Sequence, residues 1–194
     1  MNFLAHIYLS GDNDLIKIGN FMADGIRGKD FTHFPPDVQK GILLHRAIDT
    51  FTDAHPIFRQ GTKRLHEKYH HYAGVILDVF YDHFLAKNWN RYSAEKLDDS
   101  AKKFYQSLED NYALLTDRAK RVLPFMKADN WLVRYATVAG ISKTLSNMDR
   151  RTGNESGISG APAELLQYYN NFESEFSDFF DELYKMASQK LSEL

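Results

Sequence analysis

Apolar residues recur at helical spacing along most of this chain. From position 37 to 53 they fall every three or four residues, which predicts an amphipathic helix. From about position 72 to 89 the apolar stripe is so wide that we expect a central and mostly buried helix. The alternation typical of a strand is found only in the short stretch 3–9. The hydrophobic pattern therefore favours an all-α protein.

Polar caps and prolines divide the second half of the chain into further helices. Ser93 is a candidate N-cap for a helix that reaches about position 115. Thr116 or Asp117 is placed to cap the next helix, which Pro124 is expected to bend or break. These signals predict at least two amphipathic helices between positions 93 and 150.

The segment 151–162 contains three glycines, so we expect a loop long enough to be mobile. Pro162 suits the first turn of a final helix that reaches about position 191. The chain has neither internal repeats nor low-complexity segments. We therefore predict one compact all-α domain of seven to nine helices spanning 1–194.

Composition narrows the chemistry more than it narrows the fold. The 194 residues are 43% hydrophobic and 26% charged, as in globular proteins, and the formal net charge of −2 gives no bias toward nucleic acid. The absence of cysteine excludes disulfides, thiol nucleophiles and thiolate metal sites. No run approaches the roughly 18 apolar residues of a membrane helix, and the start of the chain lacks a basic leader segment. We expect a cytoplasmic protein with no membrane partner.

Histidine and charge are both distributed unevenly. All eight histidines precede Phe84. The segment 118–151 has eight basic residues and two acidic ones, for a net charge of +6, whereas residues 153–194 have eight acidic residues and two lysines, for a net charge of −6. The first 90 residues are thus the candidate active-site half. Residues 91–194 form a second helical half with a basic segment (118–151) and an acidic C-terminal helix.

Candidate catalytic groups lie at helical spacing in the first half. His45 and Asp49 are four residues apart, so their side chains share one helix face, and Asp53 adds another turn to it. Asp78 and Asp82 repeat the spacing on the second predicted helix, where buried carboxylates are costly unless they are paired or bind metal. A helical His/Asp pair also occurs on solvated faces or as a buried hydrogen bond, and Asp53 is also placed to end its helix.

Imidazole and carboxylate ligands favour Mn²⁺, Mg²⁺, Fe or Zn²⁺ over softer metals. Asp24 lies between glycines, where the backbone can approach a ligand closely. A divalent ion polarises a phosphoryl oxygen and lowers the pKa of a bound water molecule. Because the chain has no cysteine, water activated in this way is the nucleophile that we expect.

Four segments carry a resemblance to a known family. They are Met-Asn-Phe-Leu-Ala-His at 1–6, Gly-Asn-Phe-Met-Ala-Asp at 19–24, the stretch 44–56 around His45 and Asp49, and the stretch 77–85 around Asp82. In these segments the chain resembles the acyl carrier protein phosphodiesterases. The likeness is strong over roughly the first 90 residues, and beyond them it rests mainly on length and helical character.

The resemblance implies hydrolysis of the phosphodiester between 4′-phosphopantetheine and a serine of holo-acyl carrier protein, with a divalent metal such as Mn²⁺ (Mg²⁺ or Fe²⁺ as alternatives). It also implies a fold distantly similar to HD-domain phosphohydrolases, whose signature is His…His-Asp…Asp. This chain lacks an adjacent His-Asp pair and has only the reversed order at 82–83.

Site roles follow from the same resemblance. It implies that the metal is held by Asp24, His45, Asp49 and Asp82. The further ligands or catalytic and orienting groups that it implies are His6, Asp53, Asp78 and His83, with Arg46 and His55 near the phosphoryl group.

Acyl carrier proteins are small and acidic, so the basic segment 118–151 is a candidate docking face for the substrate. The alternative is that its charges pair with the acidic C-terminal segment. Two other functions stay open at this point: a phosphohydrolase of nucleotides or other small phosphoesters with the same site, and a non-catalytic helical adaptor for an acidic protein.

Overall fold

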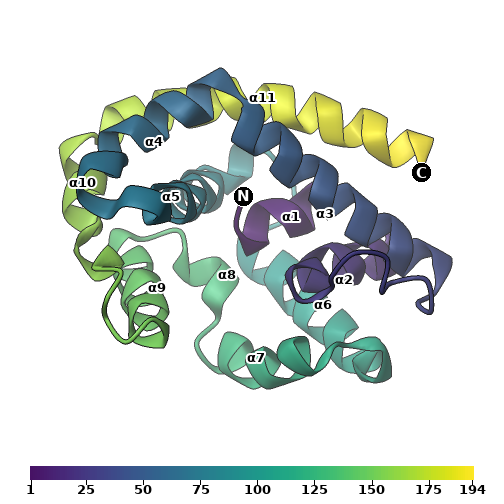
Figure 1. The fold of residues 1–194 in the computed structure, drawn as a ribbon. Helices are drawn as coiled ribbons and strands as arrows, with labels where there is room; N and C mark the ends of the chain where they lie inside the picture. Colours follow the sequence, from purple (N-terminus) through teal and green to yellow (C-terminus); the bar gives the residue numbers. More distant parts are fainter.

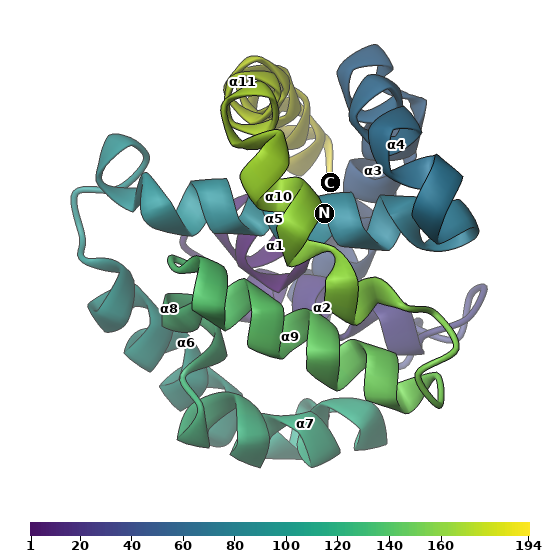
Figure 2. The same cartoon turned by 90° about the vertical axis from the view of Figure 1, so that its left-hand side faces the viewer.

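Helix α5 (Ala73–Lys87) runs through the middle of the molecule, as its wide apolar stripe predicts. In the computed structural model, which describes residues 1–194, α5 packs against α1, α4, α9 and α11. Figure 2 shows α11, α3 and α4 on one side of α5, and α9, α8 and α7 on the other. Most of its residues are buried, including two that can ionise, Asp82 and His83.

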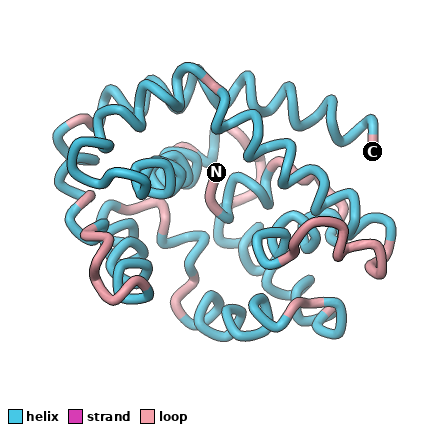
Figure 3. Tube along the Cα trace, viewed as in Figure 1, coloured by secondary structure: helices cyan, strands magenta, loops and turns pink.

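The chain forms eleven α-helices and five short 3₁₀ turns, with no strand (Figures 1 and 3). The helices other than α5 are α1 (Phe3–Tyr8), α2 (Asp14–Met22), α3 (Pro36–Ala54), α4 (Pro56–Tyr69), α6 (Leu97–Asp110), α7 (Asp117–Ala128), α8 (Trp131–Arg134), α9 (Val138–Arg151), α10 (Pro162–Gln167) and α11 (Tyr169–Glu193). The predicted all-α class and single compact domain are confirmed, and the helices outnumber the predicted seven to nine. No helix is both long enough and apolar enough to cross a membrane.

Two glycines let the backbones of α2 and α3 approach each other closely. A Cβ added at Gly19 would lie 2.1 Å from the carbonyl oxygen of Val38, and one added at Gly41 would lie 2.1 Å from that of Ile16. Real side-chain atoms never approach a backbone so closely, so both positions require glycine. The close contact fixes how α2 sits relative to the functional face of α3.

Aromatic side chains fill the core on the α11 side. The apolar face of α11 buries Phe172, Phe176, Phe179, Phe180 and Leu183. The ring of Phe179 packs against those of Phe58 on α4 and Tyr81 on α5, with centroids 6.2 Å and 5.4 Å apart. Burying such rings supplies the dominant favourable term in folding. This packing joins the C-terminal helix to the half of the chain that carries the histidines.

The stretch 3–9 is helical, although its alternation is that of a strand. Helix α1 has only six residues and no cap from its own sequence. The carboxylate of Asp82 takes that role, because it accepts hydrogen bonds from the amides of Leu4 (2.7 Å) and Ala5 (3.1 Å). A tertiary contact thus overrides the local pattern.

Several predicted boundaries differ from those of the structure. The helix expected from Ser93 begins at Leu97, because the Ser93 hydroxyl instead accepts from the amide of Glu95 in a turn. Thr116 does cap α7, which continues through Pro124. The final helix begins at Pro162 as predicted, but it is interrupted at Tyr168 between α10 and α11.

Candidate metal centre and its cleft

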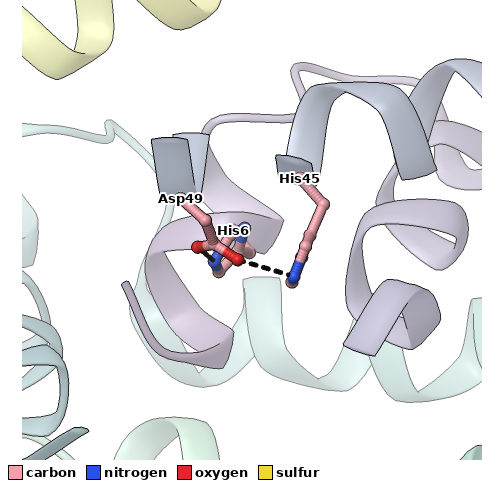
Figure 4. Close-up of side chains that lie close together, drawn as sticks. All are labelled: His6, His45 and Asp49. Carbon is pink, nitrogen blue, oxygen red and sulfur yellow. Dashed lines mark ion pairs between the residues drawn. The ribbon is translucent and has the colours of Figure 1, made fainter. Parts of the chain in front are cut away.

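His6, His45 and Asp49 meet where α1 faces α3 (Figure 4). The Nε2 atom of His6 lies 3.2 Å from Oδ1 of Asp49, and the Nε2 atom of His45 lies 3.0 Å from Oδ2 of the same carboxylate. The two imidazoles stack with centroids 4.1 Å apart. One ligand atom from each of the three residues lies within 4.8 Å of the others. The predicted spacing of His45 and Asp49 therefore places both on one face, and His6 joins them from another helix.

Asn20 on α2 orients both imidazole rings. Its Nδ2 donates to the carbonyl of His6 (3.0 Å) and to the hydroxyl of Ser10 (2.9 Å), which fixes the orientation of the amide. Its Oδ1 then faces Nδ1 of His6 at 2.7 Å and Nδ1 of His45 at 3.1 Å. An amide oxygen only accepts hydrogen bonds, so both rings carry a hydrogen on Nδ1. The lone pair of each neutral imidazole is therefore on Nε2, toward Asp49.

The charges of this cluster are strongly coupled. Burial opposes protonation of His45, but hydrogen bonds to Asp24 and Asp49 outweigh it and raise the pKa of His45 to about 9. Burial, together with the positive charge of its neighbours, lowers the pKa of His6 to about 4. Burial raises the pKa of Asp49, but the hydrogen bond from His45 and the nearby positive charge of the chain's α-amino group outweigh it and hold the pKa well below its usual value. At neutral pH the site thus holds an ionised Asp49 and a neutral His6.

When His6 is neutral, its buried Nε2 atom accepts no hydrogen bond. Its Nε2 lies 3.0 Å from the carbonyl oxygen of Met1 and 3.2 Å from the Asp49 carboxylate, with the only ring hydrogen on the opposite nitrogen. Three electron-rich atoms therefore face one another, with the α-amino group of Met1 3.6 Å from the Asp49 carboxylate, and a divalent cation among them would stabilise the arrangement. Two imidazole nitrogens and a carboxylate are a donor set that fits a divalent transition metal.

Asp24 extends the cluster to the solvent side. It follows α2 directly, in the short 3₁₀ turn at 23–25, and its Oδ1 lies 3.1 Å from Nε2 of His45. Its Oδ2 lies 3.7 Å from the guanidinium of Arg118 on α7, whose side chain is 52% exposed. The hydrogen bond from His45 lowers the pKa of Asp24. The Asp24 carboxylate and the Arg118 guanidinium thus lie side by side next to the two histidines.

The cluster borders a cleft of about 390 Å³. Asp24, Asp49, Asp53 and Asp78 line one part of it, together with the first residues of the chain. The α-amino group of Met1 lies 2.9 Å from Asp78 and 3.6 Å from Asp49. Burial opposes its charge, but these carboxylates raise its pKa, so it is an ammonium group.

Three arginines, from α7, α8 and α9, face this acidic wall from the other side of the cleft: Arg118, Arg134 and Arg151. The basic segment 118–151 therefore contributes directly to the cleft, which sequence spacing did not indicate. The acidic C-terminal segment does not neutralise it. Its ion pairs go instead to α4 and α5, as Lys68–Glu164, Lys87–Glu173 and Arg64–Glu175. No ion pair joins residues 153–194 to the basic segment, so the predicted alternative pairing is wrong.

Asp82, expected among the metal ligands, lies outside the cluster. It is fully buried, and both of its oxygens accept backbone hydrogen bonds at the start of α1. The expectation was wrong because the carboxylate serves as a helix cap. It holds α1, and through α1 it positions His6.

Two predicted site histidines have structural partners instead. His83 is buried, with Nδ1 2.8 Å from the carbonyl of Tyr135 and Nε2 2.8 Å from the Tyr169 hydroxyl. His55 caps α4 by accepting from the amide of Ile57, and its Nε2 lies 3.2 Å from Glu182. Neither histidine lines the cleft, so the expected role of His83 as a further ligand or orienting group and that of His55 near the phosphoryl group are not supported.

Arg46 also points away from the cleft. Its guanidinium donates to the carbonyl of Ile26 at 3.3 Å and lies 5.0 Å above the ring of Phe31. It therefore holds the segment that follows Asp24, and its expected role near the phosphoryl group is not supported.

Sequence reasoning missed two residues that shape the site. Asn20 lies within the motif at 19–24, and its position four residues before Asp24 on a helical pattern was a usable signal. Arg118 appeared only as one of eight basic residues, and nothing in the sequence singled it out. Its proximity to Asp24 depends on how α7 folds back toward α2.

Comparisons with known proteins point to one family. The family model described as acyl carrier protein phosphodiesterase matches residues 1–183. A protein of that name from Photorhabdus laumondii is 33% identical over 194 residues, covering 98% of this chain and 96% of the relative. Namesakes from Salmonella agona and Yersinia enterocolitica are 31% and 29% identical, and each alignment covers 98% of this chain and 99% of the relative.

No solved structure matches the chain at a significant level, so the similarity to HD-domain phosphohydrolases stays a prediction. The match to the family model extends well beyond the four motifs, into the basic segment and most of α11. The resemblance noted in the first 90 residues thus holds over nearly the whole chain. The chain belongs to the acyl carrier protein phosphodiesterase family.

Proposed function

We propose that this protein hydrolyses the phosphodiester that joins 4′-phosphopantetheine to a serine of holo-acyl carrier protein, and that it uses a divalent metal to do so. The observation that carries the proposal is the convergence of the Nε2 atoms of His6 and His45 on the Asp49 carboxylate beside a cleft. Membership in a family named for this phosphodiesterase activity gives the substrate class.

His6, His45 and Asp49 are the proposed metal ligands, with Asp24 as a fourth group at the solvent side. The family resemblance makes Mn²⁺ the proposed ion, with Mg²⁺ or Fe²⁺ as alternatives, and nitrogen and oxygen donors are compatible with it. When bound, such an ion neutralises charge on a phosphoryl oxygen and lowers the pKa of a water molecule. Asn20 keeps both imidazoles in the tautomer that binds metal, as the outer partners of metal-binding histidines generally do.

The remaining residues of the cleft orient the phosphodiester. Arg118 is proposed to bind a phosphoryl oxygen, because its guanidinium is largely exposed and has only a long contact with Asp24. Asp53 and Asp78 are proposed to act on protons, since both line the cleft and the leaving serine oxygen must take up a proton. The water oxygen bonds to phosphorus as the bond to the serine oxygen breaks, giving 4′-phosphopantetheine and the apo protein.

The basic segment is the proposed docking face for the acidic carrier protein. Arg121 and Arg150 are exposed, Lys143 is 52% exposed, and no residue of the acidic C-terminal segment pairs with them. Lys143 pairs with Asp129, but the segment keeps a net positive charge, which attracts an acidic partner and speeds association. Because this term is screened by salt, turnover of the carrier protein is expected to fall as ionic strength rises.

The direct test is incubation of the purified protein and Mn²⁺ with holo-acyl carrier protein, followed by mass spectrometry of both products. We expect apo-carrier protein and free 4′-phosphopantetheine. His45→Ala and Asp49→Ala should each reduce the rate by at least about 100-fold, because each removes a ligand. His66→Ala, at an exposed histidine outside the cleft, is the matched control and should keep the wild-type rate.

The outcomes separate the alternatives. Hydrolysis of free nucleotides without any release of 4′-phosphopantetheine would replace the proposal with a small-molecule phosphohydrolase. Binding of the carrier protein that survives both alanine substitutions, with no turnover by any variant, would favour an adaptor.

A further inference from the structure

We propose that the part of the cleft between α5 and α9 binds the pantetheine arm of the substrate, while the carrier protein stays outside on the basic segment. This inference rests on the proposed function and adds the position of each half of the substrate. It does not depend on which metal is bound.

Two helix faces form the walls of this part of the cleft. From α5 come Val75, Asp78 and Val79, which share one face at helical spacing. From α9 come four residues that form a single stripe along that helix: Thr144, Asn147, Met148 and Arg151. Because α5 and α9 pack against each other, these stripes face one common space that continues to the metal cluster through Asp78 and Met1.

The chemistry of these walls matches the arm rather than a protein. A pantetheine arm carries a dimethyl group, methylene units and two amides. Val75, Val79 and Met148 offer apolar contacts for the dimethyl group and the methylene units, and the Val75 residue is 38% exposed. The Thr144 hydroxyl has no hydrogen-bond partner within the protein and is free to bind an amide.

The volume of the cleft decides which half of the substrate it can hold. About 390 Å³ lies within the roughly 300–1,000 Å³ of small-molecule pockets, and it is far too small for a folded carrier protein. Arg151 both lines the cleft and is exposed, so it marks the boundary between the cleft and the basic segment. The serine end of the phosphodiester is therefore directed outward and the arm inward.

The test measures binding of 4′-phosphopantetheine by titration calorimetry, in the presence of Mg²⁺, together with turnover of holo-carrier protein. Thr144→Phe fills the space between the two walls and should weaken binding at least tenfold. Ala139→Phe introduces the same side chain at an exposed position of α9 outside the cleft, and should bind and react like the wild type. In the wild type, pantetheine without its phosphate should still bind, but more weakly.

A second readout separates arm binding from general damage. We expect Thr144→Phe to lose at least tenfold more kcat/KM on holo-carrier protein than on bis(p-nitrophenyl) phosphate, which has no arm. Equal losses on both substrates, or binding by Thr144→Phe that equals the wild type, would overturn the inference. If the wild type binds 4′-phosphopantetheine but releases none from holo-carrier protein, the arm site stands and the proposed reaction fails.

Discussion

The orienting role of Asn20 leads to a quantitative prediction. This fully buried side chain makes four hydrogen bonds, of which two fix the tautomers of His6 and His45. In Asn20→Ala the Ser10 hydroxyl still donates to the carbonyl of His6, at 2.7 Å in the wild type, but the two Nδ1–H groups lose their acceptor. Each stranded buried donor costs about 1–3 kcal/mol, so we expect a loss of about 2–6 kcal/mol of stability without metal.

The effect on metal binding is the more specific one. Removing the outer partner of a metal-binding histidine typically costs about 10–100-fold in affinity, and here one residue serves two histidines. We therefore expect the Mn²⁺ affinity of Asn20→Ala to fall by about 100-fold, as measured by titration calorimetry under conditions where circular dichroism shows a folded protein. Asn20→Asp keeps an acceptor for both Nδ1–H groups, and should retain Mn²⁺ binding within about tenfold of the wild type.

The control lies on the same helix. Asn13 caps α2 by accepting from the amides of Leu15 and Ile16, so Asn13→Ala should cost about 1 kcal/mol of stability. It should leave Mn²⁺ affinity unchanged, because Asn13 does not contact the histidines. The reasoning is refuted if Asn20→Ala binds Mn²⁺ within twofold of the wild type, or if Asn13→Ala loses as much affinity as Asn20→Ala.

Three further predictions concern packing, pH and the reassigned histidine. Gly19→Ala should lower the melting temperature markedly, because its Cβ would meet the carbonyl of Val38, whereas Gly74→Ala on α5, where nothing lies within 4 Å, should raise stability slightly. Because the pKa of His45 is raised from 6.5 to about 9 without metal, its stabilising contribution is complete below about pH 6.5 and is lost as the pH rises through 9. In EDTA the melting temperature should therefore fall over that range, while Mn²⁺ binding at pH 7.5 should release close to one proton, seen by calorimetry in buffers of different ionisation enthalpy. His83→Ala should destabilise the fold by about 2–4 kcal/mol in chemical unfolding, because both of its ring nitrogens form hydrogen bonds within the core, and it should leave Mn²⁺ affinity unchanged. Each argument has an outcome that contradicts it: an unchanged melting temperature for Gly19→Ala, no proton release on Mn²⁺ binding, or weaker Mn²⁺ binding by His83→Ala.

Much of the site could be predicted because it is local in sequence. The i, i+4 spacing of His45 and Asp49 survives folding unchanged, since both lie within one helix whose bounds the apolar pattern predicts to within a residue or two. Asp24 follows a helix that packs on the same face, so it too arrives at the cluster. His45, Asp49 and Asp24 were therefore predicted correctly to lie close together, because one helix and its neighbour fix their positions.

The failures all involve partners that are distant in sequence. His55 and His83 lie in the same motifs as the cluster, but Glu182 and Tyr169 on α11 bond to them from 127 and 86 residues away. Asp82 was misassigned because its partners are backbone amides of another helix, which no spacing rule can indicate. Polar residues of one short motif thus divide between chemistry and structure according to contacts that only the fold determines.

The shortness of α1 has a consequence for the stability of the proposed metal centre. A helix of six residues is not stable alone in water, so α1 persists only through its packing and through the cap that Asp82 provides from α5. Local unfolding of α1 would withdraw His6 while leaving His45 and Asp49 in place on α3. Amide hydrogen exchange at Leu4 and Ala5 should therefore report the lifetime of the complete donor set, and it should slow when a divalent ion binds.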